Sequence, residues 1–317
     1  MQHYQTAKRI IENIDKAIIG KHESVELAVI TLLSEGHLLL EDVPGVGKTT
    51  LANALACSLG CGFSRIQFTP DTLPSDVTGL SIYNMKEGSF EFSRGAVMSN
   101  IVLADEINRT SPKTQASLLE AMQERQVTID GKTYPLEAPF MVIATQNPID
   151  FLGTYNLPEA QLDRFLIRLS IGYPSFPDET SMAEQYLSGS AGTQLEAVAG
   201  KEDILTMQRE VASVRMAKDV VSYVVNIVGG TRENASFALG ASPRATLALV
   251  RTSQACAYLA GRDYVLPDDV QKMAPYVLCH RLVLTPEAKI KNLTAESVLS
   301  EIIHKIHVPI LPDSNPS

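Results

Sequence analysis

The chain has 317 residues, of which 45% are hydrophobic and 20% are charged, and its formal net charge is −9. These values exclude an intrinsically disordered chain, and the acidic balance disfavours nucleic-acid binding through phosphate neutralisation. The sequence contains no apolar run of the roughly 18 residues that a membrane-spanning helix needs, and its first residues lack the apolar segment of a signal peptide. We therefore expect a cytoplasmic protein without a membrane span. At about 150 residues per domain, the length predicts two domains.

The first part of the chain alternates between helical and apolar segments. Isoleucines and alanines recur at three- and four-residue spacing, which predicts a helix over residues 1–20 and a second one over about 22–35. The expected strands that follow are His37–Leu40, Phe63–Phe68, Ile101–Ala104, Phe140–Thr145 and Phe165–Ile171. Near-continuous apolar strands separated by helices are typical of a parallel sheet buried on both faces. The pattern therefore predicts a doubly wound α/β domain over residues 1–174.

Two segments interrupt this alternation, and both are expected to project from the core. Residues 70–99 include Gly88–Gly95, which has the composition of a short β segment. Residues 127–134 include Asp130-Gly131, a pair that favours a hairpin turn.

A second domain is expected after the proline-containing linker Tyr173–Pro177. No strong strand pattern follows this linker. The expected helices are 178–188, 201–214, 217–229, 242–260 and 267–281. This spacing predicts a small helical domain over residues 178–308.

The segment Asp42–Thr49 predicts a phosphate-binding loop, because it lies between an expected strand and the helical run Thr50–Leu59. Its glycines let backbone N–H groups point at phosphates, its lysine reaches the β- and γ-phosphates, and its threonine hydroxyl is a ligand for Mg²⁺. The usual pattern begins with glycine where this chain has Asp42; aspartate tolerates a left-handed backbone, so the loop is still expected to form. The predicted nucleotide contacts are Pro44, Gly45, Val46, Gly47, Lys48, Thr49 and Thr50.

Polar side chains follow two of the expected strands. Asp105 and Glu106 end one strand, and Asn147 follows another. Ligands gather at this edge of open α/β sheets. Downstream of a phosphate loop, Asp105 is predicted to hold a magnesium-bound water and Glu106 to polarise the attacking water, whereas Asn147 would contact the γ-phosphate or water. Taken alone, an acidic pair at a strand end is usually solvated surface, and Asn147 is also explained as the former of an Asn-Pro turn.

The order of these features resembles that of the AAA+ ATPases. Asp163-Arg164-Phe165 and the segment Gly240–Arg244 follow at the matching places. Two longer stretches, Glu106–Glu124 and Leu157–Phe165, are similar to the MoxR branch of that superfamily. The resemblance covers roughly residues 8–281.

This resemblance implies a P-loop NTPase core with a parallel five-stranded sheet and a C-terminal all-α lid domain. It implies that residues 70–99 are the helix-2 insert of this branch and that residues 127–134 are its pre-sensor-1 hairpin. The site roles that it implies are Ile18, Ile19 and Gly20 around the adenine, Asn147 as sensor 1, Arg164 as the arginine finger, and Arg244 as sensor 2. From the residues alone, Arg164 is also explained by an ion pair with Asp163, Arg109 and Arg168 compete for its role, and Arg244 is also explained as a surface arginine.

The function predicted is Mg²⁺-dependent ATP hydrolysis, with ATP bound between the α/β domain and the lid. The resemblance implies a homo-oligomeric, hexameric ring with chaperone-like action in the maturation of protein complexes or in metal-cofactor insertion, beside von Willebrand factor A domain partners. Two alternatives stay open: a magnesium-chelatase-like motor subunit, and a nucleotide-dependent binding switch with little turnover. Hydrolysis is favoured because Lys48, Asp105, Glu106 and Asn147 are all present, whereas a switch needs only the binding residues.

Overall fold

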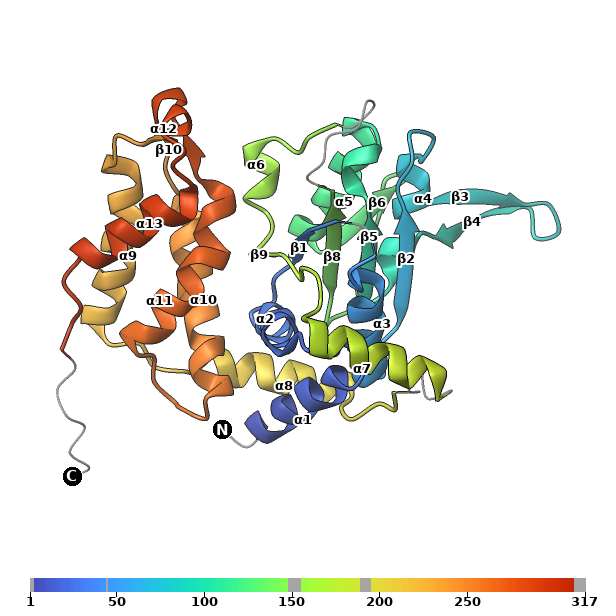
Figure 1. The fold of residues 1–317 in the computed structure, drawn as a ribbon. Helices are drawn as coiled ribbons and strands as arrows, with labels where there is room; N and C mark the ends of the chain where they lie inside the picture. Colours follow the sequence, from blue (N-terminus) through green and yellow to red (C-terminus); the bar gives the residue numbers. More distant parts are fainter. Residues whose placement is uncertain (1–2, 44, 148–154, 189–194, 311–317) are drawn as a thin grey trace. The chain divides into compact units, whose positions relative to one another are not determined.

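The computed structural model describes residues 3–43, 45–147, 155–188 and 195–310 (Figure 1). Contacts divide the chain into two compact units, one up to Met207 and the other from Gln208 onward. This boundary lies later than the linker expected at Tyr173–Pro177. The Val198 N–H donates to the carbonyl of Ser58, so the chain after that linker still packs on the first unit. The division by contacts therefore falls later in the chain than the expected start of the second domain at residue 178.

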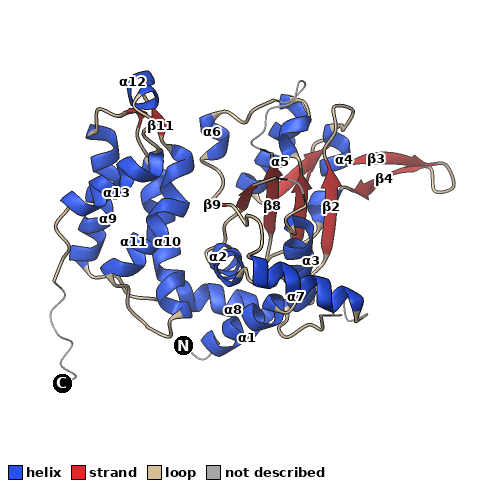
Figure 2. Ribbon diagram, in the orientation of Figure 1, coloured by secondary structure: helices blue, strands red, loops and turns tan. Residues whose placement is uncertain are grey.

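The first unit contains a five-stranded parallel sheet in the order β2-β5-β8-β1-β9. Its strands are β1 (Leu38–Glu41), β2 (Phe63–Gln67), β5 (Ile101–Asp105), β8 (Met141–Gln146) and β9 (Ile167–Leu169). All five were predicted, and β5 is buried along its whole length. The predicted parallel α/β fold is confirmed, and its layers are visible in Figure 2.

Along the chain, helices precede, separate and follow the strands of this sheet. They are α1 (Tyr4–Asp15), α2 (His22–Leu33), α3 (Lys48–Ser58), α4 (Pro74–Thr78), α5 (Pro112–Glu124), α6 (Glu159–Leu162) and α7 (Phe176–Leu187), and α8 (Lys201–Ala212) crosses into the second unit. Short 3₁₀ helices occupy Ala96–Met98 and Ile107–Arg109. The first helix was expected to reach Gly20, but it ends at Asp15. There the chain makes a turn, in which the Ile14 carbonyl accepts from Ala17 and Ile18, and Gly20 then has φ +72°.

Both interruptions of the α/β pattern form antiparallel hairpins. They are β3 (Gly79–Asn84) with β4 (Ser89–Arg94), and β6 (Gln126–Ile129) with β7 (Lys132–Pro135). Asp130 and Gly131 both have positive φ, 49° and 76°, as the predicted hairpin turn requires. Both hairpins also contact the domain, because Val127 is buried in the main core and Phe92 stacks on Tyr134 with ring centroids 4.1 Å apart. The tips of the hairpins are exposed, but their bases pack on the domain.

The second unit is mainly helical, as predicted. Its helices after α8 are α9 (Lys218–Glu233), α10 (Pro243–Leu259), α11 (Pro267–Leu278), α12 (Pro286–Ile290) and α13 (Ala295–Lys305), with a 3₁₀ turn at Cys279–Arg281. It also contains an antiparallel pair of β10 (Phe237–Leu239) and β11 (Val283–Leu284), which periodicity missed because strands of three and two residues are too short for a pattern. Within the described ranges, no helix is long and apolar enough to span a membrane.

Candidate functional site

The phosphate loop predicted between β1 and α3 has the backbone of an anion-binding loop. Gly45 and Gly47 have φ of +88° and +93°, and Gly47 is the N-cap of α3. A Cβ placed on either glycine would meet none of the described atoms within 4 Å, so the space beside both glycines is open. A helix N-terminus beside such a loop attracts anions through its dipole and its unpaired N–H groups. Pro44, the loop residue before Gly45, lies outside the described residues.

The side chain of Lys48 points back toward the start of the loop. Its Nζ donates to the backbone carbonyl of Asp42 at 2.8 Å. Burial lowers the pKa of Lys48, and this effect is opposed by the charges of Asp42, Asp105 and Glu106. Because the Lys48 ammonium is partly buried, water screens its charge less, and its attraction to a phosphate is stronger than in bulk water.

Asp42 stands where the phosphate-loop pattern usually has glycine, and it has a function in the loop's structure. Its carboxylate is buried and accepts from the Gly172 N–H at 2.7 Å, the Ser170 hydroxyl at 3.0 Å and the Val43 N–H at 2.8 Å. The aspartate therefore ties the start of the loop to the chain that follows β9.

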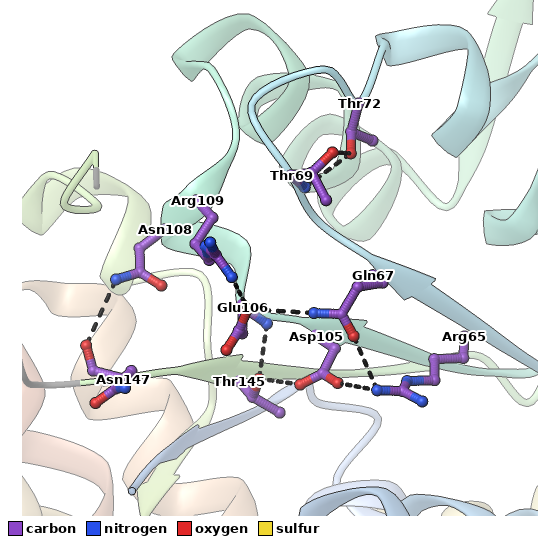
Figure 3. Close-up of polar contacts among 10 residues, drawn as sticks. All are labelled: Arg65, Gln67, Thr69, Thr72, Asp105, Glu106, Asn108, Arg109, Thr145 and Asn147. Carbon is purple, nitrogen blue, oxygen red and sulfur yellow. Dashed lines mark hydrogen bonds and ion pairs between the residues drawn. The ribbon is translucent and has the colours of Figure 1, made fainter. Parts of the chain in front are cut away.

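Asp105 and Glu106 lie together at the end of β5, as predicted, and both form hydrogen bonds with Thr145 of the neighbouring strand β8 (Figure 3). The Thr145 hydroxyl donates to Asp105 Oδ1 at 2.7 Å and accepts from the Glu106 N–H at 2.8 Å. Glu106 has φ +56° and ψ +51°, an uncommon conformation for a residue other than glycine. The sheet thus fixes both carboxylate-bearing residues in position.

Three further side chains surround the two carboxylates. Arg65 Nη2 lies 2.6 Å from Asp105 Oδ2 and also donates to Gln67 Oε1 at 2.8 Å. Gln67 Nε2 and Arg109 Nη1 both donate to Glu106 Oε2, at 3.2 and 2.8 Å. Figure 3 shows this chain of contacts from Arg65 to Glu106.

A cavity of about 400 Å³ joins the phosphate loop to the end of β5. Its lining is Gly45, Gly47, Lys48, Thr49, Thr50, Arg65, Gln67, Asp105, Glu106 and Asn147. The structure therefore brings together the phosphate loop, the acidic pair and the predicted sensor Asn147. Val46, the remaining described residue among the loop's predicted nucleotide contacts, is partly buried and is not among these lining residues.

A second cavity, of about 660 Å³, shares the lining residue Thr50 with the first. Ile19 also lines it, whereas Ile18 is buried. A Cβ on Gly20 would lie 2.2 Å from Asp178 Oδ2, and its φ is +72°, so this position requires glycine. Ile19 of the predicted adenine-contacting segment therefore lines a cavity that shares Thr50 with the phosphate-loop cavity.

The oxygen donors suit Mg²⁺, which keeps several waters and takes few protein ligands. Thr49 and Asp105, the predicted ligands, line the same cavity. Among the residues that the structure describes, there is no cluster of three or more His, Cys, Asp or Glu side chains that would form a metal site made by protein alone. The donor set fits a cation that arrives with a nucleotide.

Comparison with known proteins decides the family. A model of the ATPase family associated with various cellular activities (AAA) matches residues 37–167, and a model of the AAA lid domain matches residues 229–302. Chaperone MoxR1 of Mycobacterium tuberculosis is 42% identical over 313 residues, which cover 96% of this chain and 82% of that protein. The chain belongs to the MoxR family of AAA+ ATPases.

Two further comparisons cover almost the whole length of this MoxR-family chain. YeaC of Bacillus subtilis, a protein described as uncharacterized, is 53% identical over 302 residues, which cover 95% of this chain and 94% of that protein. A crystal structure from Cytophaga hutchinsonii, provisionally assigned as an ATPase, has a TM-score of 0.91 at 38% identity and covers 97% of this chain and 96% of that one. Both the α/β core and the helical lid are therefore shared with known structures.

The arginines that the MoxR resemblance singled out have different surroundings. Arg164 Nε donates to Gln123 Oε1 at 3.1 Å. The two competitors are engaged in the site or the sheet, since Arg109 contacts Glu106 and Arg168 Nη1 lies 3.1 Å from Glu41 Oε2. Arg244 lies in the first turn of α10, in the second unit. Its role toward nucleotide, like that of Arg164, stays a prediction.

Sequence reasoning missed four contributors to this site, namely Arg65, Gln67, Thr145 and the carboxylate of Asp42. A weak signal was available for Arg65 and Gln67, because residues two apart on a strand share a face. Nothing in the sequence indicated that this face meets Asp105. For Thr145, its position two residues before Asn147 placed it near the same sheet edge without indicating its partners.

Proposed function

We propose that this protein hydrolyses ATP with Mg²⁺ and uses the reaction to remodel partner proteins. The observation that carries the proposal is the shared cavity, in which the open phosphate loop faces Lys48, Asp105, Glu106 and Asn147. The family assignment supports the same activity, because its members are AAA+ ATPases.

Each side chain has a chemical role in this proposal. The loop N–H groups and Lys48 bind the phosphates, and Glu106 takes the proton from the water that attacks the γ-phosphorus while the bond to the bridging oxygen breaks. Asn147 orients that water or the γ-phosphate. Thr49 and Asp105 would hold Mg²⁺, which supplies positive charge to the phosphate oxygens when bound.

One observation favours a second candidate, a binding switch with slow turnover. Glu106 Oε2 accepts from both Arg109 and Gln67, so this carboxylate oxygen is already occupied by hydrogen-bond donors and is not free to accept a proton from an attacking water. A general base must be within hydrogen-bond reach of the proton that it removes. We therefore expect slow basal hydrolysis that rises when a partner changes these contacts.

We further propose a homo-oligomeric, hexameric ring, with Arg164 acting on nucleotide in the neighbouring subunit. Phosphoryl transfer gains from a cation outside the nucleotide's own loop, and Arg164 is only partly buried. The relative named Chaperone MoxR1 supports a chaperone-like use of the hydrolysis. We propose the maturation of protein complexes or metal-cofactor insertion as the purpose of this action. Von Willebrand factor A domain proteins are the partners to test first.

Two variants test the proposed hydrolysis. Lys48→Ala removes a phosphate contact and should weaken binding of fluorescent ADP, whereas Glu106→Gln should keep ADP binding and abolish phosphate release. Lys289→Ala and Glu287→Gln on α12 are matched controls, because both side chains are exposed and lie in the second unit. Wild-type rates of phosphate release in Glu106→Gln would contradict the assignment. Nucleotide binding with no Mg²⁺-dependent release, even with partners added, would favour the switch.

A further inference from the structure

We propose that Arg65 is an internal counter-ion of Asp105 that competes with the divalent cation for this carboxylate. The inference rests on the proposed function, because it concerns the cation that accompanies ATP. It assigns to Arg65 a positioning role in which the side chain occupies the cation's place until Mg²⁺-nucleotide arrives.

Both oxygens of Asp105 are engaged, but from different sides. Oδ1 accepts from Thr145, a buried residue of the neighbouring strand β8. Oδ2 lies 2.6 Å from Arg65 Nη2, and Arg65 lines the same cavity as Thr49. The oxygen available to a cation is therefore the one that Arg65 holds.

The two partners differ in how firmly they are held. The Asp105 side chain is 12% exposed, whereas the Arg65 side chain is 46% exposed. The carboxylate is thus fixed in the sheet edge, while the guanidinium lies toward solvent. A partly exposed ion pair is weak, so its cationic partner is exchangeable.

Arg65 also retains a partner when it leaves the carboxylate. The same Nη2 that contacts Asp105 donates to Gln67 Oε1 at 2.8 Å. Gln67 lies two residues further along β2, on the same face of the strand. Release of Asp105 therefore does not leave the guanidinium without an acceptor, which lowers the cost of exchange.

A guanidinium and a divalent cation cannot share one carboxylate oxygen without mutual repulsion. Removing the positive charge of Arg65 should therefore tighten cation binding. If Arg65 instead only held Asp105 in the orientation that a cation needs, its removal would weaken cation binding. The sign of the change separates the two roles.

The experiment measures Mn²⁺ binding to the full-length protein with saturating ADP, using the electron paramagnetic resonance signal of free Mn²⁺. We expect Arg65→Gln to bind Mn²⁺ about fivefold more tightly than wild type. This ratio corresponds to the free energy of a partly exposed ion pair at the upper end of its usual range. Arg65→Lys keeps a charge on a side chain that lacks the planar fork, so it should tighten binding only about twofold. Arg215→Gln is the matched control, because Arg215 forms an exposed pair with Asp263 at 2.8 Å in the second unit.

A second readout is thermal stability without nucleotide. Arg65→Gln leaves the Asp105 charge without its counter-ion, so its melting temperature should fall, and Mn²⁺ with ADP should raise it by more than in wild type. Arg65→Lys provides the Mn²⁺ measurement if the glutamine variant does not fold.

The outcomes separate this inference from the proposed function. Equal or weaker Mn²⁺ binding in Arg65→Gln, with normal binding in wild type, overturns the competition and leaves the proposed function standing. If wild type binds neither ADP nor Mn²⁺ with ADP, both proposals are wrong. Tightening in Arg215→Gln equal to that in Arg65→Gln would also overturn the inference, because the effect would then not come from Asp105.

Discussion

Asp42 provides a sharp test of how the phosphate loop is held, because the aspartate replaces the glycine that begins the usual pattern. In Asp42→Ala, the Gly172 N–H and the Ser170 hydroxyl lose an ionised acceptor. The bond from Val43 is local and half-buried, and water can replace it. The main cost therefore comes from the bonds that join the loop to the chain after β9, chiefly the one from Gly172.

Hydrogen bonds to charged groups contribute about 1.5–3 kcal/mol each. Ser170 is exposed, so its hydroxyl can turn to water, and we discount its bond to near zero. The part-buried Gly172 contact and the packing of the buried Asp42 side chain then leave a loss of about 2–3 kcal/mol. At about 2–4 °C per kcal/mol for a unit of this size, the melting temperature should fall by roughly 4–12 °C.

Differential scanning calorimetry of the full chain measures this shift, and titration with fluorescent ADP measures the loop directly. We expect ADP affinity to fall by up to about tenfold, since 1.4 kcal/mol of extra ordering cost corresponds to that factor. Asp42→Asn is the matched control, because its amide oxygen can still accept from Gly172. Asp42→Gly restores the usual loop residue but removes the same bonds, and should therefore resemble Asp42→Ala.

The reasoning would be refuted if Asp42→Ala and Asp42→Gly melted within about 1 °C of wild type and bound ADP equally well. A large loss of stability with unchanged ADP affinity would show that the tie to Gly172 stabilises the fold without shaping the loop.

The remaining predictions concern pH, a hairpin and the ring. His37 is buried, and desolvation, with a smaller effect of the Arg125 charge, lowers its pKa from 6.5 to about 3. Between these two pH values only the unfolded chain takes up this proton, so the stability contributed by neutral His37 is lost as pH falls. The free energy of unfolding should fall by about 2 kcal/mol between pH 8 and pH 5. This part of the pH dependence should be missing in urea titrations of His37→Gln. Deletion of residues 129–132, at the exposed tip of the β6–β7 hairpin, should leave ADP binding and thermal stability nearly unchanged, and a large fall in melting temperature would show that the tip supports the core. Arg164→Ala and Lys48→Ala should each be inactive, and an equal mixture should recover up to about one quarter of wild-type phosphate release, provided subunits act independently in a heterologous ring. Failure to recover activity in co-assembled rings of such subunits would contradict a trans role for Arg164.

The sequence by itself determined the parts of this protein that depend on local chemistry. Gly45 and Gly47 adopt the positive φ that an anion-binding loop needs, and the apolar runs that predicted the strands form one parallel sheet. Asp105, Glu106 and Asn147 were placed at one edge because the carboxyl ends of parallel strands meet there. Each inference uses neighbouring residues, whose spacing is fixed by the geometry of helix, strand or turn.

The tertiary structure decided which distant side chains meet. Arg65 contacts Asp105 because β2 lies beside β5, and Thr145 joins Asp105 to Glu106 because β8 lies on the other side of β5. Periodicity gives the face on which a side chain lies, but it gives neither the order of strands nor their register. Asp42 shows the same limit, since its acceptor role toward Gly172 requires the chain after β9 to return beside β1. The contacts that hold the candidate site together therefore arise from strand order, a property of the folded sheet as a whole.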